Sequence, residues 1–225
     1  MLRDCKSPFI EQFQHPLGWC AKFYKLTAYN NCNFWCEYCY LYLTFRTCPV
    51  STHFVNYDRM FKDVEISVNT DKVWQYLEHR TPSPTDRLQA ARKVQDTGYE
   101  VRLRIDPVVR YSTWEKDYRG LTELIFDYVE PSRITIGEYR PAEGLSSHIK
   151  TRFPESSLLK INGSLIADSG KLRYPREGRI EMFRAIADGI RRCDKKVRIA
   201  LCKETPQVWK ASGLEGRGLC CNCTG

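Results

Sequence analysis

TDRLQAARKVQDTGYEVRLRID, residues 85–106, places a helical pattern directly before a strand pattern. Apolar residues recur every three positions at Leu88, Ala91 and Val94, as on one face of a helix. Thr85 precedes this pattern as a candidate cap, and Gly98 follows it as a left-handed stop. From residue 101 to 106, apolar and charged residues then alternate, which is typical of a strand with one buried face. A helix that leads straight into a strand indicates an α/β unit.

The flanking sequence continues this alternation. Because strands joined through helices pair in parallel with right-handed crossovers, we expect an α/β domain with a mostly parallel sheet. A polar loop is expected to run to about residue 178. The other predicted strands cover 24–30, 65–70, 133–138 and 197–201. The other predicted helices cover 56–64, 121–128 and 145–152. Two more helices are expected, one that ends at residue 192 and a short one that begins with Thr205 and Pro206.

Composition and charge limit the class of protein. The chain has 225 residues, 42% of them hydrophobic and 28% charged, so it can bury a core and is expected to form a single domain over 1–225. It opens without an apolar run of signal-peptide length and has no stretch of ~18 uncharged apolar residues, which predicts a cytoplasmic protein with no membrane segment. The net charge of +8 favours a polyanionic partner through counterion release, although many ordinary enzymes are this basic.

Three of the eleven cysteines crowd into NNCNFWCEYCYL, residues 30–41. Cys32, Cys36 and Cys39 have the spacing C-x3-C-x2-C just after a predicted strand, so their thiolates can wrap around a metal cluster. Zinc is a second interpretation, but it usually takes four ligands, and only Cys48 and His53 are nearby as a fourth. In a third, the cysteines are buried side chains without a ligand.

This cysteine spacing, with an aromatic residue before the last cysteine, resembles the signature of the radical S-adenosylmethionine enzymes. Other segments resemble the spore photoproduct lyase family within that superfamily. The resemblance covers most of residues 20–140 and implies a partial (β/α) barrel core there, with 141–225 as a C-terminal extension that ends in a cysteine-rich tail. The matching segments are CYL at 39–41, SVN at 67–69, Glu78 ahead of TPS at 81–83, RLQAARKV at 87–94 and GY at 98–99.

The resemblance also implies cofactors and a reaction. The three cysteines would ligate a [4Fe-4S] cluster whose fourth iron binds S-adenosylmethionine. One electron, from a donor such as flavodoxin or ferredoxin, would cleave this cofactor to a 5′-deoxyadenosyl radical. In the lyases the radical repairs a thymine photoproduct, so the implied partner is DNA. A monomer is expected.

Several side chains are assigned roles by the same resemblance. Tyr38 and Tyr40 match tyrosines that return a hydrogen atom to the substrate, although aromatic residues that merely shield a cluster from water would look the same. Ser67 and Asn69 match positions near the ribose of the cofactor, although both are also ordinary residues for a turn after a strand.

Two further candidate sites come from the residues themselves. Arg104 and Asp106 share one side of their strand, where they could hold the carboxylate of the cofactor or a substrate phosphate; the alternative is an edge strand with a solvated face. Four other cysteines could form a second metal site, or the tail could be reactive and without regular structure; they are Cys202, Cys220, Cys221 and Cys223. The single histidines, His15, His53, His79 and His148, form no ligand pair and are assigned no role.

One part of the family pattern is missing. A barrel of this kind has about six strand-helix units, yet the sequence leaves no room for the second and third strands between Val64 and Glu65. We therefore expect a barrel that lacks two or so units. The leading hypothesis is a radical enzyme resembling spore photoproduct lyase. The alternatives are a non-catalytic nucleic-acid-binding protein with an iron-sulfur or zinc site, and an inactive shortened relative.

Overall fold

The computed structural model describes residues 2–3, 10–13, 23–26, 29–30, 35–38, 52–54, 63–168 and 170–214, with side chains described within 36–38, 65–168 and 170–214. The strand expected over 24–30 is wrong as one element, because its two halves pair antiparallel with different neighbours and lie in separate small sheets. The short strands of this first part are β1 (Leu2–Arg3), β2 (Ile10–Phe13), β3 (Phe23–Leu26), β4 (Tyr29–Asn30), β5 (Trp35–Cys36) and β6 (Thr52–Phe54).

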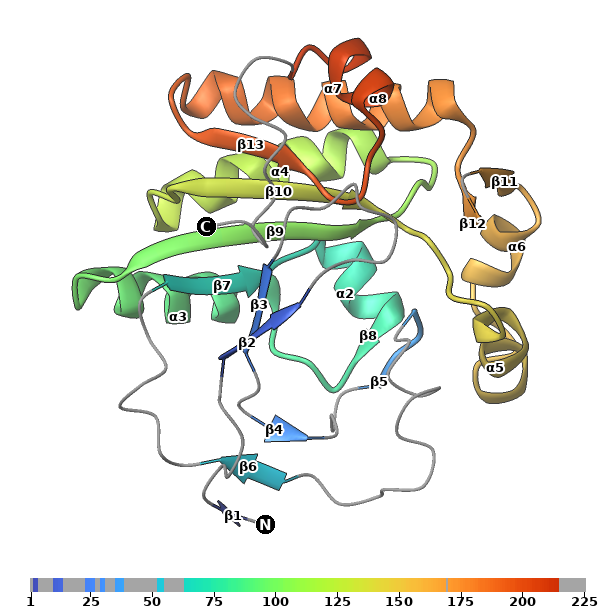
Figure 1. Ribbon diagram of the computed structural model, residues 1–225, viewed down its shortest axis with the longest axis horizontal. Coiled ribbons are helices and arrows are strands. Elements are labelled where there is room, and N and C mark those ends of the chain that lie inside the picture. The colour runs from blue at the N-terminus through green and yellow to red at the C-terminus, as the bar shows by residue number, and fades with distance from the viewer. Residues whose placement is uncertain are drawn as a thin grey trace.

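The main sheet has the strand order β13-β10-β9-β7, and every neighbouring pair in it is parallel. Its strands are β7 (Asp63–Ser67), β9 (Glu100–Val108), β10 (Arg133–Glu138) and β13 (Arg198–Leu201). Strands that follow one another in sequence are neighbours in space, as in a barrel rather than a doubly wound sheet. The predicted α/β partial barrel is confirmed, and the part of the chain that the structure describes contributes four parallel strands to it (Figure 1).

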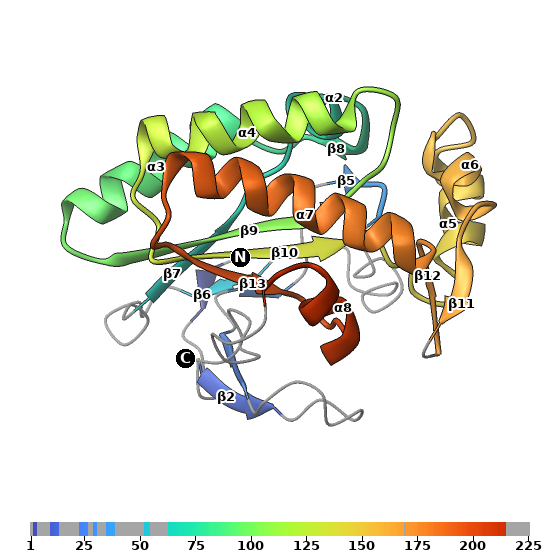
Figure 2. The same cartoon turned by 90° about the horizontal axis from the view of Figure 1, so that it is seen from above.

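Helices cover one face of this sheet (Figure 2). They are α2 (Asp71–Leu77), α3 (Pro84–Asp96), α4 (Trp114–Tyr128) and α7 (Arg176–Cys193). On β9, Val101, Leu103 and Ile105 are fully buried in the core that these helices share, while the charged residues between them face the other way. No helix among the described residues combines the length and the apolar character needed to span a bilayer.

Shorter elements gather beyond the carboxyl ends of the strands (Figure 1). The polar loop expected to residue 178 is wrong, because this region contains a helix and an antiparallel hairpin. Leu158 is fully buried and anchors that helix. The elements are β8 (Glu78–His79), α5 (Leu145–Arg152), α6 (Leu158–Asn162), β11 (Ile166–Asp168), β12 (Lys171–Arg173) and α8 (Pro206–Ala211).

The ends of several elements differ from the sequence-based expectation. The helix expected through residue 64 is wrong at its end, because β7 begins at Asp63 and pairs there with β9. Helix α3 is capped by Ser83 rather than Thr85, since Ser83 and Asp86 form a reciprocal capping box with Pro84 at the first turn. Gly98, at φ +91°, follows that helix as predicted. Helix α4 begins at Trp114, well before the expected 121.

Candidate active site

Cys36 is held at the carboxyl edge of the main sheet by strand pairing. Strand β5 pairs antiparallel with β8, which sets Cys36 opposite Glu78, and the amide of Glu37 donates a 2.9 Å hydrogen bond to the carbonyl of Leu77. Because β8 directly follows α2, this pairing ties the cysteine segment to the first helix after β7. The middle cysteine of the triplet is therefore half-buried at the edge where α/β barrels place their chemistry.

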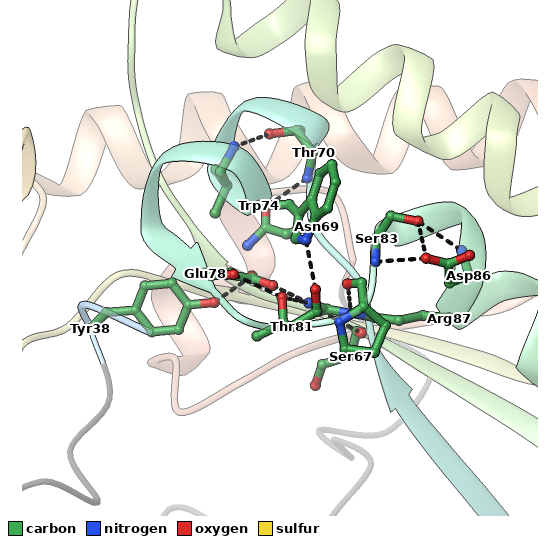
Figure 3. Close-up of polar contacts among 12 residues, drawn as sticks. Tyr38, Ser67, Asn69, Thr70, Trp74, Glu78, Thr81, Ser83, Asp86 and Arg87 are labelled. Atoms are coloured by element: carbon green, nitrogen blue, oxygen red, sulfur yellow. Dashed lines mark hydrogen bonds and ion pairs between the residues drawn. The ribbon is translucent and has the colours of Figure 1, made fainter. Parts of the chain in front are cut away.

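Glu78 is the centre of a buried hydrogen-bond network (Figure 3). Its carboxylate is 3% exposed and accepts hydrogen bonds from the Tyr38 hydroxyl on one oxygen and from the Arg87 guanidinium on the other. Arg87 also donates to Thr81 Oγ1 at 2.7 Å and to the carbonyls of Pro82 and Ser67 at 3.0 Å and 3.3 Å. A buried carboxylate is stable only when it is paired in this way.

The phenol of Tyr38 is kept protonated by its surroundings. Burial raises the pKa of Tyr38 well above its ordinary value, and the charges of Glu78 and Cys36 and the hydrogen bond to Glu78 raise it further. Cys36 lies two positions before Tyr38 on the same segment. This site thus presents a neutral O–H group beside a cysteine of the triplet.

Glu37, between Cys36 and Tyr38, forms a second buried contact. It is 4% exposed and accepts hydrogen bonds from His79 Nε2, at 2.9 Å, and from the hydroxyl of Ser156. The ring of His79 in turn stacks on Phe153, with centroids 5.3 Å apart. The cysteine segment is thereby joined to the region that follows α5, which is far away in the sequence.

Asn69 and Ser67 have different surroundings. Asn69 is 1% exposed; its Nδ2 donates to the carbonyl of Pro107 at 2.8 Å, and its Oδ1 accepts from the Tyr118 hydroxyl at 2.9 Å. It therefore links the end of β7 to β9 and α4. Ser67 is exposed at the end of β7, and only its backbone carbonyl is engaged by Arg87. Cofactor contact by either residue stays a prediction.

Arg104 and Asp106 lie on the face of the sheet opposite the helices, as the alternation predicted. Arg104 forms a 2.7 Å ion pair with Glu65 across the β7–β9 pair, and its second nitrogen lies 3.5 Å from Asp106 and 3.9 Å from the sulfur of Cys202. Asp106 packs over Gly137 of β10, where a Cβ would lie 2.6 Å from its carboxyl carbon. The two side chains are thus brought together on this face.

A buried ionic cluster ties the β11–β12 hairpin to the same strand ends. Arg173 of β12 lies 2.5 Å from both Glu138 and Glu204, which are fully buried. Arg179 of α7 lies 3.3 Å from Glu204 and 2.7 Å from Asp168. Burial raises the pKa of Glu138 to about 7, although Arg173 opposes the shift, and burial also raises the pKa of Glu204. The cluster fixes the hairpin next to the carboxyl edge.

Part of this arrangement resembles a known family in sequence. Residues 63–162 match the family model of spore photoproduct lyase. Over these residues, less than half of the chain, the protein is therefore similar to the spore photoproduct lyase family. The spore photoproduct lyase of Clostridium acetobutylicum is 29% identical over 98 residues, and that of a Geobacillus species is 32% identical over 97. These matches take in 44% and 41% of this chain but only 27% and 28% of the relatives' lengths.

Solved structures of spore photoproduct lyase share the fold. One, complexed with dinucleoside spore photoproduct, has a TM-score of 0.70 over 89% of this chain and 82% of its own, at 17% identity. A second, a double mutant with bound S-adenosylmethionine and dinucleoside spore photoproduct, has a TM-score of 0.64 over 76% and 74%, at 19% identity. The resemblance to the spore photoproduct lyase family expected from the sequence is confirmed.

The structure covers only some of the predicted site residues. Among the residues whose side chains are described, no group of three or more His, Cys, Asp or Glu could hold a metal ion. Cys202 is buried beside Arg104, so one member of the possible second metal site is described. Other predicted residues lie outside the described residues: Cys32, Cys39 and Tyr40 of the first site, and Cys220, Cys221 and Cys223 of the second.

The residues that hold the site together were not predicted from the sequence. Glu78 was noted only as part of a family-like segment, Arg87 had no role, and His79 was set aside because no second histidine is near it. One signal was available: Glu78 and Arg87 lie on either side of Thr-Pro-Ser, which caps a helix and so fixes their spacing. The pairing of Glu37 with His79 has no comparable local signal.

Proposed function

We propose that this chain is a radical S-adenosylmethionine enzyme that repairs a thymine photoproduct in DNA, like the spore photoproduct lyases to which it is related. One observation carries the proposal: the middle cysteine of the triplet and a protonated tyrosine lie together at the carboxyl edge of a parallel partial barrel. Its basic charge, and the dinucleoside spore photoproduct bound by structural neighbours, support a DNA substrate.

The described residues fit the proposed cofactors. A thiolate half-shielded from water, on a segment anchored by strand pairing, is a suitable ligand for an iron-sulfur cluster, so Cys36 would hold it together with Cys32 and Cys39. The facing pair Arg104 and Asp106 could bind the charged groups of S-adenosylmethionine. When bound, the cluster and S-adenosylmethionine supply a carbon-centred radical that removes a hydrogen atom from the substrate.

The chain's own residues would then orient and shield the reaction. In this structure Tyr38 holds its hydrogen on the phenol oxygen and donates it to Glu78. Tyr38 is proposed to turn this hydrogen from Glu78 and return it as a hydrogen atom to the product, which would leave a tyrosyl radical, with Tyr40 as its partner. Ser67, exposed at the end of β7, is proposed to contact the ribose of the cofactor. Asn69 is proposed to position that strand end, because both of its polar atoms are already bonded inside the protein.

The test is anaerobic reconstitution with iron and sulfide, followed by reduction with dithionite in the presence of S-adenosylmethionine. We expect the absorbance of a [4Fe-4S] cluster and accumulation of 5′-deoxyadenosine, and with dinucleoside spore photoproduct as substrate we expect release of repaired thymidine dinucleoside. Replacing Cys36 with alanine should abolish both the cluster and the cleavage. Cys193, which is exposed on α7, is the matched control, and Cys193→Ala should change neither.

The outcomes separate the alternatives. Cluster assembly without 5′-deoxyadenosine would contradict the radical enzyme and favour a non-catalytic or inactive relative. Colourless protein with stoichiometric zinc would contradict both interpretations that need a cluster. Reduction by flavodoxin or ferredoxin stays a prediction, which replacing dithionite with each of these donors tests. A monomeric state also stays a prediction, which light scattering on the same preparation tests.

A further inference from the structure

A pocket of about 820 Å³ lies beside the cysteine segment. Its lining does not include Arg104 or Asp106, so it is separate from the polar face of the sheet. Its walls come from α2, from the loop after β9 and from residues 153–161, which follow α5. Glu37 and His79 are among its lining residues. The volume is within the range of roughly 300–1,000 Å³ that ligand pockets occupy in proteins.

Aromatic rings line this pocket. Tyr76 of α2 is 67% exposed, which is unusual for so large a side chain and leaves its ring available to a ligand. Phe153 is stacked with His79 at an interplanar angle of 27°, so each ring covers part of one face of the other. Tyr111 completes the lining, with its hydroxyl 2.8 Å from that of Thr70. Flat aromatic surfaces of this kind suit a nucleobase.

The charged groups of the pocket leave one cation available. Lys72 is 3.2 Å from Asp117, and Arg110 is 2.7 Å from Glu181. Lys160 is exposed and forms no ion pair with any residue that the structure describes. The lining also has two carboxylates, and that of Glu37 is occupied by His79 and Ser156. The carboxylate of Glu155 forms no ion pair with a described residue, so the unpaired charges of the pocket are one cation and one carboxylate. Lys160 is the group that suits a phosphate.

We propose that this pocket binds one nucleotide of a DNA strand, next to the nucleotides that react. Its base would stack on the Tyr76 and Phe153 walls, and its phosphate would contact Lys160. The inference rests on the proposed function, because it identifies the ligand as the single-stranded continuation of that substrate. The pocket is well placed for this role: His79 and Ser156 line it and also hold Glu37, the residue between Cys36 and Tyr38.

The test compares two ligands on the reconstituted enzyme before reduction. One is the dinucleoside spore photoproduct, and the other is the same lesion extended by one thymidylate on each side. We expect the extension to lower Kd by roughly 5- to 100-fold, the gain typical of one stacked base. Tyr76→Ala and Lys160→Gln should each remove most of this gain. Lys160→Gln should also reduce the slope of log Kd against log salt by about 0.7, the value for one phosphate contact on a single strand.

Two matched controls lie at the opposite edge of the sheet. Tyr99, 39% exposed before β9, and Lys195, exposed before β13, supply Tyr99→Ala and Lys195→Gln, which should keep the full gain. An equal Kd for both ligands, or a gain that survives in both pocket variants, would overturn the inference. Binding is measured without turnover. Failure of the wild-type protein to form 5′-deoxyadenosine would therefore count against the proposed function, and the binding result could still be interpreted.

Discussion

The hydroxyl of Tyr38 donates a hydrogen bond to the buried carboxylate of Glu78, a residue forty positions further along the chain. Tyr38 belongs to the cysteine segment, whereas Glu78 lies in β8, between the first two helices after β7. The bond therefore joins the proposed cluster-binding segment to the parallel sheet through side chains as well as through the β5–β8 pairing. Both contacts act on the same few residues, so the phenol is held in one orientation beside Cys36.

Tyr38→Phe tests whether that phenol takes part in the reaction. Phenylalanine keeps the ring but removes the O–H group, so we expect 5′-deoxyadenosine to form at a rate close to that of the wild type, while repaired product falls by about tenfold or more. Loss of one hydrogen bond to a buried carboxylate should also lower the free energy of unfolding by about 1–3 kcal/mol. Chromatography of one reaction mixture measures the ratio of repaired product to 5′-deoxyadenosine. An unchanged ratio would leave Tyr38 only a shielding role.

Arg87→Ala tests the electrostatic support of Glu78. Arg87 is the cation paired with this 3% exposed carboxylate, and removing one partner of a buried ion pair typically costs about 3–5 kcal/mol. Arg92 on the same helix is the control: both partners of its pair with Asp96 are 55% exposed, so Arg92→Ala should cost less than about 1 kcal/mol. Urea denaturation measures both. Equal losses for the two variants would contradict the assigned role of Arg87.

Local patterns in the sequence predicted most of the main elements and some of their ends. The strand expected over 133–138 is β10 with the same bounds, and the alternation after Gly98 assigned the correct residues of β9 to the buried face. These signals depend only on neighbouring residues. The cap of α3 was misplaced by two residues because Ser83 and Thr85 are both good caps, and Pro84 at the first turn decides for Ser83.

The candidate site was harder to predict because its contacts join distant segments. Cys36 was identified from its spacing to two other cysteines, but its pairing with Glu78 spans 42 positions. The contact of Glu138 with Arg173 spans 35, and Glu138 sits in a strand whose residues are all buried. An acidic residue in such a strand signals a buried partner, yet one sequence does not say which arginine it is.

Gly137→Ala tests the close approach of Asp106 to β10. A Cβ at residue 137 would lie 2.6 Å from the carboxyl carbon and one oxygen of Asp106, so the carboxylate must move. We expect a loss of about 1–3 kcal/mol in the free energy of unfolding, the usual effect of overpacking. If Asp106 binds S-adenosylmethionine as proposed, the Kd for this cofactor should also rise, as calorimetry would measure.

Gly120 is the matched control for this glycine. It is exposed within α4, and a Cβ there meets no atom within 4 Å. Gly120→Ala should therefore stabilise the protein by about 0.5–1 kcal/mol, because alanine is the better helix former. A Gly137→Ala protein as stable as the wild type would mean that Asp106 can leave its position at little cost.

Stability between pH 4.5 and 7 should report the buried cluster around Glu138. Burial raises the pKa of Glu138 from 4.5 to about 7, so in this range the folded protein binds a proton that the unfolded chain has released. The free energy of unfolding therefore falls as pH rises through this window. The side chain of Glu138→Gln cannot titrate. The free energy of unfolding of this variant, relative to that of the wild type, should therefore rise by roughly 1–3 kcal/mol from pH 4.5 to 7.5.

Denaturation with urea across this pH range, with Glu115→Gln on the exposed face of α4 as the control, measures that shift. The control should follow the wild-type curve, because Glu115 stays in contact with water in the folded state. A wild-type curve parallel to that of Glu138→Gln would mean that Arg173 and Arg179 hold the Glu138 carboxylate ionised throughout the range. The hairpin would then be fixed by ion pairs of the Glu138 carboxylate throughout this pH range.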